Sequence, residues 1–270
     1  MNLNEISTQL LYTTVPIRAQ RSDGTEVGGT GFYYSVPLEG QPSRQVPFVV
    51  TNFHVVQGAR SAVLEFVERE KDLPKLGSAI RAAVPAEALG LHVSERLDIA
   101  VIPIGGFLSQ MDAAGRPVFM RSIAPSLIPT PEQWNNFAAI EEVTFVGYPS
   151  GLYDSKNFVP LARRGITASP PAVDFQGDPA FLVDAEVFPG SSGSPVFILN
   201  QGAYTVPTGL ALGNRLFFMG VLGQTIIRTE SADRSTYMGL GRVTKSPPIR
   251  EFLDQVMSKL PLGDQASRVA

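Results

Sequence analysis

The stretch DAEVFPGSSGSPVF (residues 184–197) decides how the rest of the chain is interpreted. Three serines within four positions are interleaved with two glycines: Ser191, Ser192, Ser194, Gly190 and Gly193. Gly and Ser are common in the turns of all-β proteins, so the stretch could be a surface turn. It could also be the loop that presents a nucleophilic hydroxyl. The residues elsewhere in the chain favour the second interpretation.

Small residues around Ser192 suit a nucleophile. If Ser192 attacks a carbonyl, the backbone N–H groups of Gly190 and Ser192 can point to one site, as an oxyanion hole requires. Gly190 tolerates backbone conformations that a side chain would prevent, and Gly193 lets the chain turn away without crowding the hydroxyl. The sequence therefore offers Ser192 as a candidate nucleophile, with Gly190 and Ser192 as candidate oxyanion donors.

A nucleophilic hydroxyl needs a base, and the chain has only two histidines. His54 follows the apolar run PFVVTNF, whereas His92 lies in ALGLHVSERLD and is interpreted as a structural or surface residue. Asp98 opens the apolar run DIAVIPI, where a carboxylate is partly desolvated and must be paired or neutralised. Taken alone, Asp98 is more readily interpreted as a strand-end or turn residue.

Composition excludes several classes of function. Hydrophobic residues make up 44% of the 270 residues and the net charge is −3, so neither a nucleic-acid surface nor an anionic-membrane surface is expected. The absence of cysteine excludes disulfides, thiol nucleophiles and cysteine-ligated metals. No cofactor or metal is expected, because phosphate-binding and dinucleotide-binding motifs are absent. The amino terminus does not resemble a signal peptide, and we expect a cytoplasmic location.

Short runs rich in Val, Ile, Phe and Tyr, separated by Gly and Pro, predict many strands and tight turns. The capping box of Thr130 and Gln133, with Pro131 between them, predicts a short helix that ends before Glu141. Ser246 is expected to cap a second helix that Pro261 stops. The apolar face of this helix needs a sheet surface to cover, and its residues are Ile249, Phe252, Leu253, Val256 and Leu260.

Strands on both sides of a connector suggest two all-β units in tandem. The boundaries that we expect are an N-terminal β-barrel over 1–120, a connector with a short helix over 121–140, a C-terminal β-barrel over 141–246, a helix over 247–260 and a tail over 261–270.

Three segments carry a resemblance to a known family. TNFHVV, DIAVI and PGSSGSPVF, in the order His, Asp, Ser, resemble the signature segments of chymotrypsin-like (trypsin-like) serine peptidases. The resemblance is to the bacterial branches, the glutamyl endopeptidases and HtrA-type enzymes. Supporting stretches are GTGFYY, VTFVGYPSG and FMGVLG. An α/β-hydrolase is disfavoured, because GSSGS puts Ser194 where the G-x-S-x-G motif needs its second glycine.

The resemblance implies an all-β fold of two antiparallel six-stranded β-barrels with a C-terminal α-helix, and an active site in the crevice between the barrels. His54 and Asp98 would come from the first barrel, and Ser192 with the oxyanion loop from the second. His54 would be general base and then acid, Asp98 would hold its tautomer, and Ser192 would form the acyl-enzyme. Substrate would pair with the strand that contains Gly220, Leu222 and Gly223.

Two departures from the family bear on regulation. Ser191 stands where the digestive enzymes carry an Asp that receives a newly cut amino terminus, so activation by such cleavage is not expected. HtrA-type proteins usually add a peptide-binding domain, for which too little chain remains after the terminal helix. Control would act otherwise, for instance when a regulatory protein partner orders the oxyanion loop.

Specificity depends on Glu186, six residues before Ser192. A buried acid there, at the place where trypsin-like enzymes often set the floor of the primary pocket, would favour Lys or Arg before the scissile bond. The alternative is that Glu186 points to solvent or pairs with Arg163 or Arg164.

The leading hypothesis is thus a serine endopeptidase acting on a protein or peptide substrate. One alternative is a chymotrypsin-fold binding module whose cleft docks partners with little turnover, and another is a non-catalytic all-β structural protein with a coincidental Gly/Ser loop. The intact set of His54, Asp98 and Ser192 favours the enzyme.

Overall fold

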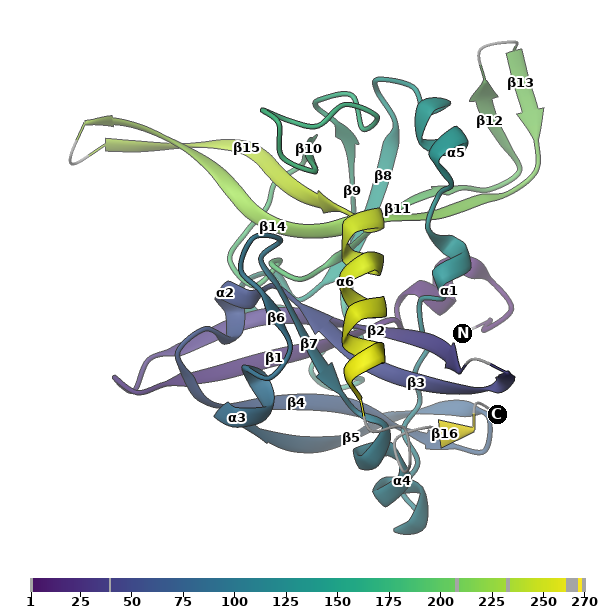
Figure 1. Cartoon of the computed structure of the whole chain (residues 1–270), viewed down its shortest axis with the longest axis vertical. Helices are drawn as coiled ribbons and strands as arrows, with labels where there is room; N and C mark the ends of the chain where they lie inside the picture. Colours follow the sequence, from purple (N-terminus) through teal and green to yellow (C-terminus); the bar gives the residue numbers. More distant parts are fainter. Residues whose placement is uncertain (1, 39, 207–208, 232–233, 261–266, 269–270) are drawn as a thin grey trace.

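Strands make up most of the regular structure, as the alternating apolar runs predict. The computed structural model describes all residues except 1, 39, 207–208, 232–233, 261–266 and 269–270. The strands form one large sheet, one closed barrel and one small hairpin (Figure 1). We refer to the large sheet and its connecting segments as the first unit, and to the closed barrel and its loops as the second unit.

The first unit is an eight-stranded sheet with the order β5-β4-β1-β2-β3-β7-β6, and β16 pairs with β3. The paired strands of this sheet are antiparallel. The two shortest strands, β6 and β16, have two residues each and raise the count above the six that were expected. The bounds are β1 (Thr14–Arg21), β2 (Glu26–Leu38), β3 (Gln41–Thr51), β4 (Ala59–Glu70), β5 (Leu73–Pro85), β6 (Val93–Ser94), β7 (Ile99–Pro103) and β16 (Ser267–Arg268).

The second unit is a closed six-stranded barrel with the order β10-β15-β14-β11-β8-β9, as expected. The distal parts of β14 and β15 extend away from the barrel, and the hairpin β12–β13 projects on the other side (Figure 1). The bounds are β8 (Glu142–Gly147), β9 (Leu161–Thr167), β10 (Ala180–Asp184), β11 (Pro195–Asn200), β12 (Ala203–Val206), β13 (Gly209–Leu212), β14 (Arg215–Ser231) and β15 (Arg234–Lys245).

Helices are short apart from the last. They are α1 (Ile6–Leu10), α2 (Phe53–Val56), α3 (Ala86–Leu89), α4 (Gly105–Ala113), α5 (Pro131–Asn135) and α6 (Ser246–Lys259), with 3₁₀ turns η1 (Pro125–Leu127) and η2 (Pro149–Gly151). Among the described residues, no helix is long and apolar enough to cross a membrane. The capping box of α5 is confirmed: the Thr130 hydroxyl accepts from the Gln133 N–H, and the Gln133 side chain accepts from the Thr130 N–H.

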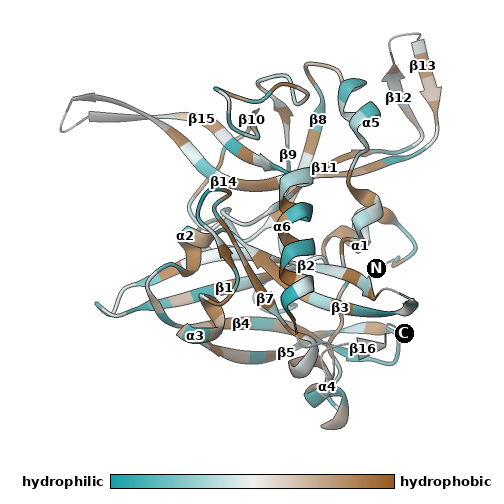
Figure 2. Cartoon of the chain, viewed as in Figure 1, coloured by the Kyte–Doolittle hydropathy of each residue, from teal (hydrophilic) through white to brown (hydrophobic). Residues whose placement is uncertain are grey.

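The apolar face of α6 packs against strands, as the sequence predicts, and it covers the junction of the two units. Ile249, Leu253 and Val256 are buried in one cluster with residues of both units, among them Phe48 of β3 and Phe218 of β14. Figure 1 shows α6 running from the barrel down to the sheet, and Figure 2 shows hydrophobic residues along β7 and β14. Burial of this face therefore holds the second unit against the first.

The prediction that Ser246 caps α6 is wrong. Lys245 is the N-cap residue and makes no side-chain cap, while Ser246 is the first helical residue. The Ser246 hydroxyl is buried and has no hydrogen-bond partner among the described residues. Pro247 and Pro248 lack N–H groups, so the first turn offers a serine cap few donors.

The predicted tail, 261–270, lies largely outside the described residues. Within it, Ser267 and Arg268 form β16 and pair with Gln45 and Arg44 of β3.

Candidate active site

His54 and Asp98 form a closely coupled pair in the first unit. His54 lies on α2, directly after β3, and Asp98 directly precedes β7, which pairs with β3. Asp98 Oδ2 lies 2.6 Å from His54 Nδ1, and Asp98 Oδ1 accepts from the His54 backbone N–H at 2.9 Å. Because an ionised carboxylate can only accept, this arrangement places a proton on Nδ1 and leaves Nε2 as the acceptor.

The backbone of Asp98 is held as firmly as its carboxylate. Asp98 adopts φ +54°, a left-handed conformation that Asp tolerates better than most residues. Its carbonyl accepts from the Asn52 side-chain amide at 2.9 Å and from the Phe53 N–H at 3.0 Å. The pair is partly open to solvent, with 39% of the His54 side chain and 27% of the Asp98 side chain exposed. The imidazole is therefore oriented and still accessible.

The oxyanion loop, which we define as residues 188–194, leaves two backbone donors free. Gly190 adopts φ +86°, a conformation that favours glycine, and a Cβ there would meet the Tyr148 carbonyl oxygen at 2.5 Å. Among the described residues, neither the N–H of Gly190 nor that of Ser192 donates to a protein acceptor. Two free donors within three residues can serve an oxyanion.

Ser192 lies beside the His54–Asp98 pair but its hydroxyl does not point to a histidine. It donates to the Gly223 carbonyl at 2.8 Å. Gly223 also borders the pair, because a Cβ at this glycine would lie 3.4 Å from Asn52 Nδ2 and 3.7 Å from Asp98 Oδ2. Residues far apart in sequence are thus gathered around Gly223. The expected contact between the hydroxyl at 192 and the imidazole at 54 is replaced here by the bond to Gly223.

The three residues of the expected substrate-binding strand occupy different surroundings. Gly223 faces the candidate site, as described above. Leu222 is buried, and its N–H and carbonyl already bond to Ser194 and Gly193 of the oxyanion loop. Gly220 lies inside the barrel ladder, where a Cβ would meet the Thr244 carbonyl oxygen at 2.0 Å. All three residues are buried, and of the three only Gly223 bonds to the Ser192 hydroxyl among the described residues.

Glu186 is not a buried acid. Its side chain is 74% exposed and lies 3.6 Å from the guanidinium of Arg163. The alternative interpretation, an exposed residue paired with Arg163, is the correct one. A carboxylate in this position is solvated, so Glu186 does not form the floor of a primary pocket. The expectation of Lys or Arg before the scissile bond, which depended on a buried Glu186, loses its basis.

Ser191 is buried, and its hydroxyl has no hydrogen-bond partner among the described residues. Its side chain therefore contributes no polar contact to the neighbouring nucleophile candidate.

His92 lies away from the pair, in the segment before β6. Burial lowers the pKa of His92 below its usual value, and the positive charge of Lys259 acts in the same direction. Its Nε2 is buried and has no partner within the part of the chain that the structure describes. These features agree with a structural role.

The direction of this pKa shift predicts an effect of pH on stability. The folded pKa lies below the unfolded one, so the unfolded chain binds more protons as the pH falls below about 6.5, and stability decreases there. We expect the free energy of unfolding of the wild type to fall more between about pH 7.5 and pH 5.5 than that of His92→Phe. Urea denaturation at both pH values measures the difference. Equal losses in the two proteins would refute the assignment.

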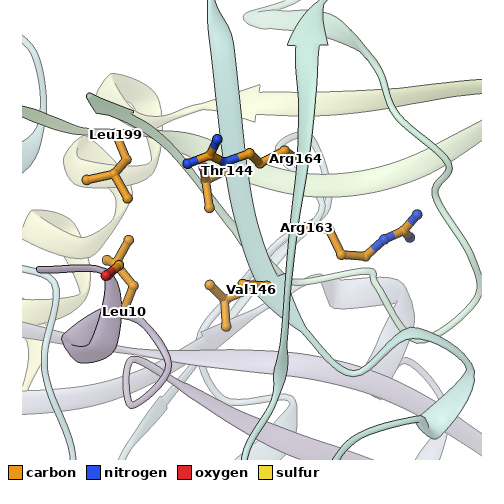
Figure 3. Close-up of a pocket in the computed structure, with 8 residues that line it drawn as sticks. Leu10, Thr144, Val146, Arg163, Arg164 and Leu199 are labelled. Carbon is orange, nitrogen blue, oxygen red and sulfur yellow. The ribbon is translucent and has the colours of Figure 1, made fainter. Parts of the chain in front are cut away.

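A separate cavity of about 230 Å³ lies between α1 and strands β8, β9 and β11 (Figure 3). Its lining is mainly apolar and contains none of the three candidate catalytic residues; it consists of Ser7, Leu10, Thr144, Val146, Ala162, Arg163, Arg164 and Leu199. Among the described residues, no group of three or more His, Asp or Glu side chains could hold a metal ion.

Among the families of known proteins, the profile of the trypsin-like peptidase domain matches residues 29–204, more than half of the chain. The chain belongs to the trypsin-like peptidase family. The matched residues of this trypsin-like peptidase include His54, Asp98, Ser192 and the whole oxyanion loop. A comparison with curated protein sequences gives no match.

Solved structures of other proteases share the fold of this trypsin-like peptidase. The HtrA-type protease AlgW with a tripeptide is 14% identical, with a TM-score of 0.52, over 98% of this chain and 65% of that one. HL collagenase is 13% identical, with a TM-score of 0.50, over 94% and 96% of the two chains. The chain thus spans about two thirds of the length of AlgW.

Sequence reasoning missed two residues whose side chains bond to backbone carbonyls of the candidate site. Thr30 lies in GTGFYY, a stretch that only supported the family resemblance, yet its hydroxyl donates to the Gly190 carbonyl of the oxyanion loop at 2.9 Å. Asn52 supports Asp98 and directly precedes the Phe53-His54 pair in TNFHVV. A polar residue flanked by glycines within an apolar strand is the signal that could have drawn attention to Thr30.

Proposed function

We propose that the chain is a serine endopeptidase that cleaves peptide bonds through His54, Asp98 and Ser192 and an acyl-enzyme intermediate. The observation that carries this proposal is the double contact of Asp98 with the side chain and backbone of His54, beside a serine whose loop has two free N–H groups. Base, orienting group, nucleophile and oxyanion donors are the parts that acyl transfer needs.

The reaction starts with a change of rotamer at Ser192. Its hydroxyl leaves the Gly223 carbonyl and turns to His54 Nε2, which takes the hydroxyl proton as Oγ bonds to the scissile carbonyl carbon. The carbonyl oxygen becomes an oxyanion that accepts from the N–H groups of Gly190 and Ser192. The Asp98 carboxylate holds the imidazole by Nδ1 and stabilises the imidazolium that forms.

Collapse of this intermediate breaks the C–N bond, and His54 gives its proton to the leaving amine. The acyl group is then bound to Ser192 Oγ as an ester. A water molecule attacks the ester, His54 takes its proton, and the second collapse returns that proton to Oγ while the acid product leaves. The Gly223 carbonyl, freed when the hydroxyl turns, is then available to accept from a substrate N–H.

Labelling with a fluorophosphonate probe tests the proposal. We expect wild type to be labelled covalently and Ser192→Ala to remain unlabelled, because the probe reacts only with an activated hydroxyl. Labelling of both proteins alike would place the reactive group elsewhere. An unlabelled wild type would favour the binding module instead, with the Ser192 hydroxyl held at rest by Gly223.

A further inference from the structure

The oxyanion loop is fixed by backbone carbonyls that bond outside it. The Gly190 carbonyl accepts from the Thr30 hydroxyl at 2.9 Å, and the Ser192 carbonyl accepts from the Thr30 N–H at 2.8 Å. The Pro189 carbonyl accepts from the N–H of Ser150. Three anchors of this kind within four residues leave the loop little freedom to rotate its peptide planes.

These anchors decide where the Gly190 N–H points. In a planar trans peptide the C=O and N–H groups point in opposite directions. Because Ser150 holds the Pro189 carbonyl, the N–H of the same peptide, which belongs to Gly190, points away from Ser150. Thr30 holds the next carbonyl, that of Gly190. The peptide before Gly190 is therefore set by Ser150, and the peptide after it by Thr30 together with a bond inside the loop, from the Ser191 N–H to the Phe188 carbonyl at 3.0 Å.

Ser150 is itself held in place by the loop that carries it. It adopts φ +50° within η2, an uncommon conformation for a residue other than glycine. Nearby, the Tyr153 hydroxyl donates to Glu65 of β4 at 2.8 Å, and the Tyr148 hydroxyl donates to the Thr14 carbonyl at 3.3 Å. Contacts with the first unit thus fix the segment that anchors Pro189.

Thr30 connects this loop to the His54 side of the site. It is fully buried in β2, and its hydroxyl accepts from the Tyr148 N–H at 3.1 Å while donating to Gly190. Its carbonyl accepts from the Thr51 hydroxyl at 2.7 Å. Thr51 ends β3, directly before Asn52, which holds Asp98. One threonine therefore bonds to the oxyanion loop, to the Ser150 segment and to the strand that leads to His54.

We propose that Thr30 is a positioning residue whose hydroxyl, together with the Ser150 N–H, orients the peptides on either side of Gly190 and so aims the Gly190 N–H at the reacting oxygen. This inference rests on the proposed function, since it assigns a role within the same site. Without the hydroxyl, the buried Gly190 carbonyl loses its donor, and among the described residues the peptide that follows Gly190 keeps only the bond from its N–H, that of Ser191, to the Phe188 carbonyl.

Substitution of Thr30 tests this role. Loss of a whole oxyanion donor lowers kcat by about 100- to 1,000-fold, so a misaimed donor in Thr30→Val is expected to lower kcat by about 10- to 100-fold. KM should stay within about twofold, because the donor acts mainly in the transition state. Thr30→Ser keeps the hydroxyl and should stay near wild type. Thr30→Ala, which also lacks the hydroxyl without adding a methyl group, should repeat the loss if the valine variant fails to fold.

Thr14→Val is the matched control. Thr14 is a buried threonine on the neighbouring strand β1 whose hydroxyl has no partner among the described residues, and valine keeps the backbone carbonyl that accepts from the Tyr148 hydroxyl. Its kcat should not change. If Thr30→Val and Thr30→Ala both fold and keep the wild-type kcat, the inference is wrong.

Crystal structures separate this inference from the proposed function. We expect wild type and Thr30→Ser to keep the orientation of the Gly190 peptides, and Thr30→Ala to show the Gly190 carbonyl turned from its wild-type position. An unchanged loop in the alanine variant would overturn the inference even if wild type showed no turnover. An inactive wild type with a turned loop in the variant would instead contradict the proposed function and leave the positioning role supported.

Discussion

Replacement of Ser192 by alanine is expected to lower turnover of a peptide substrate by about a million-fold, the scale seen when a triad nucleophile is removed. The Ser192 hydroxyl bonds to Gly223, which borders the His54–Asp98 pair, and among the described residues the N–H of Ser192 has no protein acceptor. Alanine removes the bond-forming atom and leaves the backbone donors in place. Steady-state hydrolysis of a fluorogenic peptide, with purified wild type and variant, measures the loss.

Ser191→Ala serves as the control in the same loop. Its hydroxyl is buried without a partner among the described residues, so its removal should leave turnover and melting temperature close to those of wild type. Ser192→Ala should also melt close to wild type, because it loses one partly exposed hydrogen bond of about 1 kcal/mol. Substantial proteolysis by Ser192→Ala, or an equal loss in Ser191→Ala, would remove Ser192 from its role.

Asp98→Asn is expected to lower kcat by about 10,000-fold, the scale known for an amide at this position of a triad. An asparagine can keep an oxygen for the His54 backbone N–H, so the local fold should persist. Its NH₂ group would then face Nδ1, which must become an acceptor and move the ring proton to Nε2. The imidazole would then be unable to take the Ser192 proton.

The same kinetic assay measures the effect of Asp98→Asn, with thermal unfolding as the check on folding. Asn52→Asp is not a suitable control, because it would place a second carboxylate beside the pair. A variant on the surface of the same unit, Asp23→Asn, is suitable, since Asp23 bonds only to Thr25 of its own turn in the described structure. A kcat of Asp98→Asn within tenfold of wild type would show that the carboxylate does not orient the base.

Local features of the fold were predictable because their causes lie within a few residues. The capping box at Thr130 and Gln133 and the apolar face of α6 both depend on short-range spacing. The segments around His54, Asp98 and Ser192 predicted the fold class because their sequences, and their order along the chain, could be matched to the signature segments of one family. The family assignment and the closed barrel confirm that part of the prediction.

Contacts between distant segments were not predictable in the same way. The sequence left open whether Glu186 is a buried acid or an exposed partner of Arg163 or Arg164, and the choice depends on how β9 and the segment after β10 meet. The hydroxyl of Ser192 has two competing acceptors, and only the three-dimensional structure shows that it rests on Gly223. The bond from Thr30 to Gly190 joins residues 160 positions apart and uses a backbone carbonyl, so residue types alone could not indicate it.

Trapping of the covalent intermediate tests the central claim most directly. Wild type is mixed with an activated ester, quenched in acid within the first turnovers, digested and analysed by mass spectrometry. We predict a protein mass raised by one acyl group, carried by the peptide that contains Ser192, and no such gain in Ser192→Ala. Turnover of the ester with the acyl group on another residue, or with no acylated protein at any time, would contradict the account.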